Sequence, residues 1–132
     1  NALIHTGRGV VDIVVGPEMT ATLDERPIHP VYSTFWLAYH AEVAARRAIE
    51  PFFEPGENAV GVSVHIDHEA MAAVGSSVRI TATVNEVKGR YIGCTIEAVV
   101  LPSGTRIATG TQGQVVLADA VLKEKVRQAI RE

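Results

Sequence analysis

Glu42 is the side chain whose position in the sequence most needs a chemical explanation. It lies four residues after Ala38 and three before Ala45, so a helix here would place its carboxylate within a stripe of small apolar residues. A desolvated carboxylate requires a hydrogen-bonding partner, a raised pKa or a water-lined site. Either Glu42 belongs to such a site, or it lies at the edge of the stripe and reaches solvent.

His68 could supply a second acid–base group. Side-chain alternation over residues 58 to 68 places His68 on the strand face that should meet the helix. The same face is expected to carry Val60, Val62, Val64 and Ile66, with Ala59, Gly61, Ser63 and His65 on the other. A carboxylate and an imidazole in one interior can activate water or orient a carbonyl. A core histidine at a strand end would produce the same pattern.

Thr34 precedes Glu42 by eight residues. In a helix this separation is about 80° around the axis and two turns along it. Either Ser33 or Thr34 can cap the helix start, and a capping role for Thr34 is compatible with a catalytic one.

Three other groups of reactive side chains have structural explanations. His65 and Asp67 should point away from His68 on the same strand, so no metal site is expected there. Cys94 lies on the apolar face of its strand, which favours core packing over a nucleophilic role. Arg46 and Arg47 fit a solvated surface better than a phosphate-binding site.

The elements that must position these residues are several strands and one long core helix. Branched residues and alternation predict strands over residues 9–15, 18–23, 58–68, 77–87, 91–101 and 105–117. The core helix should run from Ser33 to about Phe53, and an amphipathic helix from 119 to 131. Pro27 and Pro30 are expected to break regular structure. The pattern predicts an α+β fold in which a curved antiparallel sheet of five or six strands wraps around the core helix.

Length and composition limit the class of protein. The 132 residues suit a single domain over 1–132, and the net charge of −3 gives no sign of a nucleic-acid partner. No apolar run approaches the roughly 18 residues that span a bilayer, and the first residues lack a secretion-signal pattern. A single cysteine excludes an internal disulfide. We therefore expect a cytoplasmic protein with no membrane partner and no cofactor.

One long stretch of the sequence resembles the fluoroacetyl-CoA thioesterase family of hot-dog proteins. It reads His-Pro-Val-Tyr-Ser-Thr-Phe-Trp-Leu-Ala-Tyr-His-Ala-Glu from residue 29, then Glu-Pro-Gly-Glu from residue 54, then Val60-Gly61 and His68. The likeness covers about residues 10 to 118, with the motifs in the family's order. It implies a hot-dog fold and hydrolysis of an acyl-CoA, with a short or small acyl group, to the free acid and CoA.

The resemblance also implies site residues and an assembly. The family's catalytic threonine, glutamate and histidine match Thr34, Glu42 and His68, with Glu42 acting as general base or as nucleophile. Substrate contacts are expected at Gly61, Ser33 and Phe35. The family further implies a homodimer with its active sites at the subunit interface, and a higher oligomer stays open.

The segment before the helix leaves two alternatives. Fluoroacetyl-specific members carry lid phenylalanines there, whereas residues 25 to 29 read Glu-Arg-Pro-Ile-His, so fluoroacetate specificity is not expected. Asp24 and His29 instead resemble the Asp-x-Asn-Pro-Ile-His motif of hot-dog enoyl-CoA hydratases, with Arg26 in place of the asparagine. The second alternative is a non-catalytic acyl-CoA-binding or sensing domain on the same fold.

Overall fold

The computed structural model describes residues 1 to 131, so the last residue of the expected domain, 132, lies outside the described part. The core helix α1 spans Thr34–Ile49. Its start is fixed by Ser33, whose Oγ accepts a hydrogen bond from the backbone N–H of Trp36 at 3.1 Å. The buried side of α1 consists of Leu37, His40, Ala41, Ala44, Ala45, Ala48 and Ile49. A short 3₁₀ turn, Glu50–Phe52, follows the helix.

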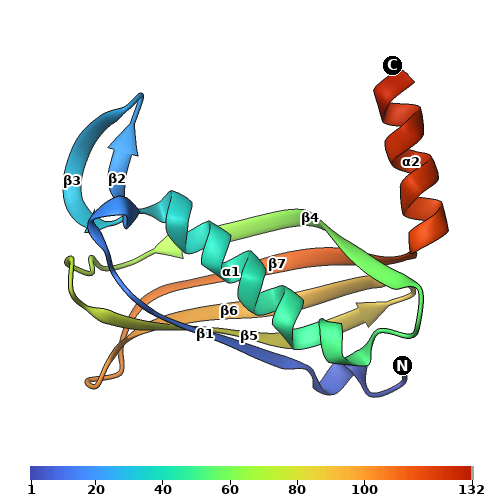
Figure 1. Cartoon of the computed structure of the whole chain (residues 1–132). Coiled ribbons are helices and arrows are strands. Elements are labelled where there is room, and N and C mark those ends of the chain that lie inside the picture. The colour runs from blue at the N-terminus through green and yellow to red at the C-terminus, as the bar shows by residue number, and fades with distance from the viewer. Residues whose placement is uncertain (132) are drawn as a thin grey trace.

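A five-stranded antiparallel sheet curls around this helix (Figure 1). Its strands are β1 (Arg8–Val14), β4 (Glu57–His68), β5 (Ser77–Lys88), β6 (Tyr91–Leu101) and β7 (Thr105–Ala118). The order across the sheet is β1-β5-β6-β7-β4, which leaves β1 and β4 at the two edges. The expected α+β hot-dog architecture, and the expected strand bounds to within a residue or two, are confirmed.

Two glycines, Gly9 in β1 and Gly7 just before it, let the helix lie very close to the sheet. A Cβ on Gly9 would lie 2.0 Å from the carbonyl oxygen of Ala44, and one on Gly7 would lie 2.1 Å from that of Ala48. The alanines of α1 and these glycines together remove the side chains that would hold helix and strand apart. The core between them is closed by β5 residues such as Ile80, which is fully buried.

A separate hairpin stands beside the start of α1 (Figure 1). It consists of β2 (Thr20–Leu23) and β3 (Arg26–Tyr32), and its turn residues Asp24 and Glu25 have φ values of 51° and 62°. The expectation that Pro27 and Pro30 break regular structure was wrong, because both lie within β3. A two-stranded ribbon leaves one side of each strand unpaired, so a residue without an N–H is tolerated there.

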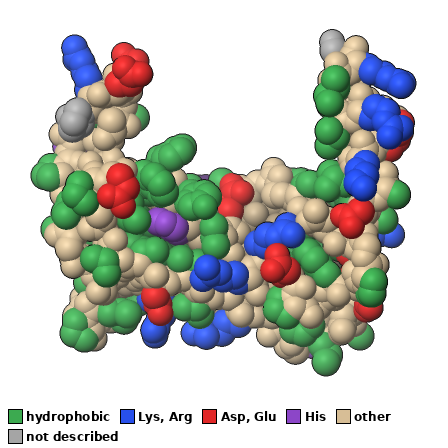
Figure 2. Space-filling model, in the orientation of Figure 1, with side chains coloured by type: hydrophobic (Ala, Val, Ile, Leu, Met, Phe, Trp, Pro, Cys, Tyr) green, Lys and Arg blue, Asp and Glu red, His purple; other side chains and the backbone are tan. Residues whose placement is uncertain are grey.

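The C-terminal helix α2 (Asp119–Arg131) extends away from the sheet at the opposite end of the molecule from the hairpin (Figure 1). None of its residues is buried. In Figure 2 its hydrophobic side chains line the side turned towards the hairpin, while Lys and Arg side chains lie on the other side. Among residues 1 to 131, no helix is long and apolar enough to cross a membrane.

Candidate active site

Thr34 and His68 meet at the start of α1. The hydroxyl Oγ1 of Thr34 lies 3.0 Å from Nδ1 of His68, which is the last residue of β4. Because Ser33 performs the capping, the hydroxyl of Thr34 is free to make this contact. The structure therefore brings together two of the three predicted catalytic side chains.

The surroundings of His68 favour the neutral form of its imidazole. Burial lowers the pKa of His68, and a contact with the backbone of Ala70 opposes this shift only in part. Its other ring nitrogen, Nε2, is buried and has no hydrogen-bonding partner in the part of the chain that the structure describes. A neutral imidazole with one unused nitrogen can take up or deliver a proton at that atom.

A hollow of about 320 Å³ surrounds this pair. Its walls come from β3, the start of α1 and the segment after β4, and they include His29, Tyr32, Ser33, Thr34, His68 and Met71. A larger hollow of about 550 Å³ lies on the opposite face of the sheet among threonines, and it contains none of the predicted catalytic residues.

The first turn of α1 offers two backbone donors near the hollow. The N–H of Ser33 donates to the carbonyl of Met19, and the N–H of Leu37 donates to that of Ser33. The N–H groups of Thr34 and Phe35 have no partner among the described residues, as expected for the first residues of a helix. The positive end of the helix dipole favours negative charge at this point. The phenyl ring of Phe35 is 77% exposed.

Glu42 occupies a different place from the one that the helical stripe predicted. It is exposed on the isolated chain, so the second interpretation, an edge position that reaches solvent, describes its surroundings. It lies about 12 Å further along the helix axis than Thr34. Its carboxylate nevertheless leans over β4, because Oε2 lies 3.3 Å from the point that a Cβ on Gly61 would occupy.

A β-bulge explains why Gly61 faces Glu42. Gly61 pairs with Gln114 of β7, but Ser63 pairs with Gly113, so Val62 is an extra residue in β4. The expected alternation therefore holds for His68 but is reversed before the bulge, where Gly61 shares a face with Gln114. Val62 is 55% exposed rather than packed on the helix.

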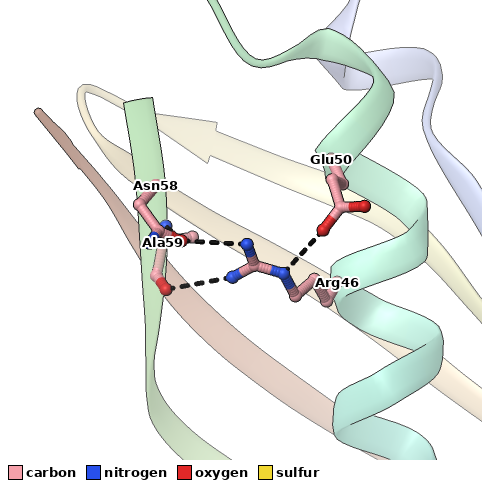
Figure 3. A network of polar contacts seen from close by, with 4 residues as sticks. All are labelled: Arg46, Glu50, Asn58 and Ala59. Atoms are coloured by element: carbon pink, nitrogen blue, oxygen red, sulfur yellow. Dashed lines mark hydrogen bonds and ion pairs between the residues drawn. The ribbon is translucent and has the colours of Figure 1, made fainter. Parts of the chain in front are cut away.

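Arg46 fixes the helix against β4 one turn after Glu42 (Figure 3). Its guanidinium donates to Oδ1 of Asn58 at 2.9 Å, to the carbonyl of Ala59 at 3.4 Å and to the carboxylate of Glu50 at 2.7 Å. Arg47 donates to the carbonyl of Val10 at 2.9 Å. Both arginines thus bind the protein's own groups, a role that the expected solvated surface did not include.

Two glutamines of β7 were missed by the sequence analysis. Gln112 and Gln114 are each only 3% exposed and lie on the helix-facing side of the sheet. The Nε2 atom of Gln112 lies 3.3 Å from the same Cβ point at Gly61 that Glu42 approaches. Polar residues at alternate positions of a strand whose inner face is otherwise apolar were the available signal.

A buried aromatic pair beside the hollow was also missed. The hydroxyl of Tyr32, which is 1% exposed, lies 2.5 Å from Nδ1 of His40, and the ring of Trp36 lies against the His40 imidazole. Burial raises the pKa of Tyr32 and lowers that of His40. The pair joins β3 to α1, and Tyr32 shares the lining of the hollow with Thr34.

Of the remaining candidate residues, only His29 lines the hollow around Thr34 and His68. His65 and Asp67 bond each other at 3.1 Å on the outer face, away from His68. Asp24 lies in the hairpin turn, whereas His29 lines the hollow, and the lining of the hollow does not include Asp24. Across residues 1 to 131, no three His, Cys, Asp or Glu side chains are placed to hold a metal ion.

The sequence can now be placed among known proteins. The family of fluoroacetyl-CoA-specific thioesterases matches residues 15 to 120, most of the chain. The chain belongs to this family. One relative, the fluoroacetyl-CoA thioesterase of Streptantibioticus cattleyicolor, is 29% identical over 127 residues, covering 89% of this chain and 87% of the relative. The predicted family and its thioesterase activity are confirmed, while the catalytic roles of individual residues stay predictions.

Solved structures of this thioesterase family have the same fold. A thioesterase superfamily member from Thermus thermophilus is 36% identical, with a TM-score of 0.92 over 97% of this chain and 94% of that one. A variant of the fluoroacetyl-CoA-specific thioesterase FlK is 28% identical, with a TM-score of 0.81 over 94% and 96% of the two chains. Another FlK variant was solved in complex with acetyl-CoA, at 27% identity and a TM-score of 0.81 over 94% and 97%.

Proposed function

We propose that this thioesterase hydrolyses a small acyl-CoA with Thr34, Glu42 and His68 as its catalytic residues. The observation that carries the proposal is the 3.0 Å contact between Thr34 and His68 beside two unpaired backbone N–H groups. This combination provides an acid–base group and an oxyanion site next to one hollow.

Each group has a defined task in the proposed reaction. The N–H groups of Thr34 and Phe35 bind the thioester oxygen as it becomes negative. Glu42 lies about 12 Å further along the same helix, so it reaches this carbonyl only in the assembled dimer. There it either removes a proton from water, whose oxygen then attacks the carbonyl carbon, or attacks that carbon itself to form an anhydride that water cleaves. When the carbon–sulfur bond breaks, the CoA thiolate receives a proton through His68, and the acid leaves as a carboxylate.

A homodimer in the cytoplasm is part of the proposal. Strand β4 is twelve residues long and forms one edge of the sheet. It exposes Val62 and Val64 by 55% and 41% in the isolated chain, and long apolar edges of this kind favour pairing with a second strand. Pairing through β4 would cover Gly61 and place Glu42, which is exposed on one chain, inside the assembled site.

The acyl group that we propose is small, but it is not specifically fluoroacetyl. Glu42, Gly61 and Gln112 approach one another around a single point, which leaves little room for a long chain. The hairpin carries exposed polar residues such as Arg26 and His29 where the fluoroacetyl-specific relatives are expected to carry phenylalanine. The exposed large apolar side chains of this hairpin, Leu23 and Ile28, are aliphatic rather than aromatic.

The deciding experiment measures thiol release from a panel of short acyl-CoAs. We expect Glu42→Gln to lower kcat/KM by roughly 100-fold or more, because the amide keeps the shape but removes the base. Glu54→Gln, an exposed control, should retain wild-type turnover. Wild-type turnover in Glu42→Gln would contradict both roles proposed for Glu42.

The same protein samples distinguish the thioesterase from the two alternative functions, a hydratase and a sensing domain. Hydration of crotonyl-CoA without thiol release would assign the chemistry to Asp24 and His29. Binding of acyl-CoA with neither reaction would indicate a sensing domain on a thioesterase fold.

A further inference from the structure

We infer that helix α2 of one protomer packs on a second copy of this chain, at the base of the partner's β2–β3 hairpin. The inference rests on the proposed function, since it extends the homodimer that pairs through β4. It begins from a helix in which no residue is buried by its own chain.

Helix α2 carries an apolar stripe without a covering surface. Apolar residues recur at spacings of three and four, and so share one side of the helix, at Leu122, Val126, Ala129 and Ile130. Val126 is 51% exposed and Ile130 is 80% exposed. The first residue is attached to the body, where the N–H of Asp119 donates to the carbonyl of Gly56 at 2.7 Å. A helix of 13 residues is marginal in water unless a packed face supports it. The stripe is therefore expected to be covered in the assembled protein.

The position of α2 identifies the covering surface. Helix α2 and the hairpin both rise beyond the β4 edge of the sheet, at opposite ends of the molecule (Figure 1). A two-fold axis through the middle of β4 pairs this strand antiparallel with its copy and exchanges the two ends. The α2 helix of one protomer then lies at the hairpin end of the other. Its hydrophobic side chains are turned towards the middle of the molecule (Figure 2), so in the dimer they face the partner.

The hairpin end has an apolar hollow that can receive the stripe. The hollow has a volume of about 360 Å³, and its lining is mostly apolar, consisting of Pro17, Thr20, Ile28, His29, Pro30 and Val74. Ile28 and Val74 are both exposed in the isolated chain. Packing of Val126 and Ile130 against them would remove apolar surface of both protomers from water.

The two surfaces also carry opposite charge. Residues 119–131 include four basic and two acidic side chains, whereas residues 16–30 include three acidic and one basic. Attraction between them favours this orientation of the two chains. A basic amphipathic helix is also attracted to anionic lipid. A second copy supplies a shaped apolar hollow in addition to negative charge, so it is the partner that the surfaces favour.

Docking of α2 would fix a wall of the partner's active site. His29 lines both this hollow and the hollow around Thr34 and His68. It lies in β3, the strand against which α2 of the other protomer would pack. Each α2 thus acts as a positioning element for the site of the opposite protomer.

Cysteine cross-linking tests the contact. Because α2 and β3 lie at opposite ends of one chain (Figure 1), a short bis-maleimide can join them only between protomers. We expect protein with both Val126→Cys and Ile28→Cys to give a covalent dimer on a denaturing gel. Each single variant should stay at the chain mass, as should the pair Glu124→Cys with Ile28→Cys, because residue 124 is on the polar side of α2. Cys94 is buried and does not compete.

The dimer dissociation constant provides a second measurement. Val126→Asp should raise it roughly tenfold or more in sedimentation experiments, because docking would bury a carboxylate among apolar groups. Gln128→Asp, on the polar side of α2, should change it by less than about twofold.

The contrary outcomes are distinct. A dimer that gives no cross-linked product and does not respond to Val126→Asp would overturn the inference, while thiol release sensitive to Glu42→Gln would leave the proposed function standing. A monomer would reject both the inference and the β4 dimer. Binding to phosphatidylglycerol vesicles that Val126→Asp abolishes, without cross-linking, would overturn the inference by assigning the stripe to a lipid surface.

Discussion

His68 illustrates how a single residue is prepared for its role by its surroundings. Its Nδ1 is occupied by Thr34 and its Nε2 lies buried without a partner. Desolvation penalises the imidazolium form, since a buried charge loses its hydration. The side chain therefore enters the reaction as a neutral base rather than as a cation.

This arrangement predicts the titration of His68. The pKa measured by NMR from the ring protons of His68 should lie below the ordinary value of 6.5. The neutral form should consequently remain the major one as the pH is lowered from 8 to 6.5, so titration of His68 should lower kcat/KM by less than about twofold over that interval. His68→Gln identifies the resonance. A pKa above 6.5 would show that an unrecognised anion, rather than burial, dominates the site.

For individual residues, the sequence identified the side chains of the candidate site better than it predicted their relative positions. Glu42 and His68 were expected in one interior, but His68 instead contacts Thr34, which only the family resemblance had grouped with it. Glu42 was selected because it interrupts an apolar stripe, but it lies next to the buried side of α1 and is exposed. Gln112 and Gln114 were missed although their alternate positions on a strand with an otherwise apolar inner face were an available signal.

At the scale of elements, glycines decide how closely α1 approaches the strands around it. Gly9 meets the helix backbone, whereas Gly61 meets only the ends of the Glu42 and Gln112 side chains. An added methyl group must displace the helix in the first case. In the second it needs only small adjustments of flexible side chains.

These two positions form a matched pair of predictions. Gly9→Ala should reduce the free energy of unfolding by about 1–3 kcal/mol through overpacking. Gly61→Ala should change it by less than about 1 kcal/mol but lower kcat/KM roughly tenfold, a loss of about 1.4 kcal/mol in transition-state stabilisation, because the methyl group displaces the Glu42 carboxylate. Urea unfolding and thiol release on the same samples measure both quantities. Equal stability losses in the two variants would contradict the different packing at the two glycines.

The elements themselves could largely be predicted from local patterns. Alternation and capping located α1, α2 and the strands of the main sheet to within a few residues. Strand β2 was expected, but β3 was missed because proline was weighed as a breaker, although β3 has an open side that tolerates it. The bulge at Val62 was also missed, since an inserted residue leaves the same run of branched side chains and reveals itself only through the pairing with β7.

At the scale of the whole molecule, the β4 edge links assembly to activity. Val62 and Val64 are exposed on this strand in the isolated chain, close to Gly61 and Glu42. Covering the strand with a second copy would remove apolar surface from water and exclude solvent from the carboxylate. Association and turnover should therefore be lost together.

We expect the wild-type protein to have twice the chain mass by light scattering. Val62→Lys should raise the dimer dissociation constant roughly tenfold or more, because pairing would bury an ammonium group, and kcat/KM should fall in parallel. Val87→Lys is the matched control, since Val87 is 45% exposed on β5, away from this edge. An active monomer would contradict the proposed arrangement of the site.

The buried position of Cys94 has a practical consequence for studying this enzyme. It is the sole cysteine of the chain, it is 1% exposed, and burial raises the pKa of its thiol to about 11. At pH 8 only about one such thiol in a thousand is ionised. A chromogenic thiol reagent added to the folded enzyme will thus record the CoA set free and almost nothing else. Cys94 becomes visible to the reagent only when the sheet opens, so one trace reports catalysis first and unfolding afterwards.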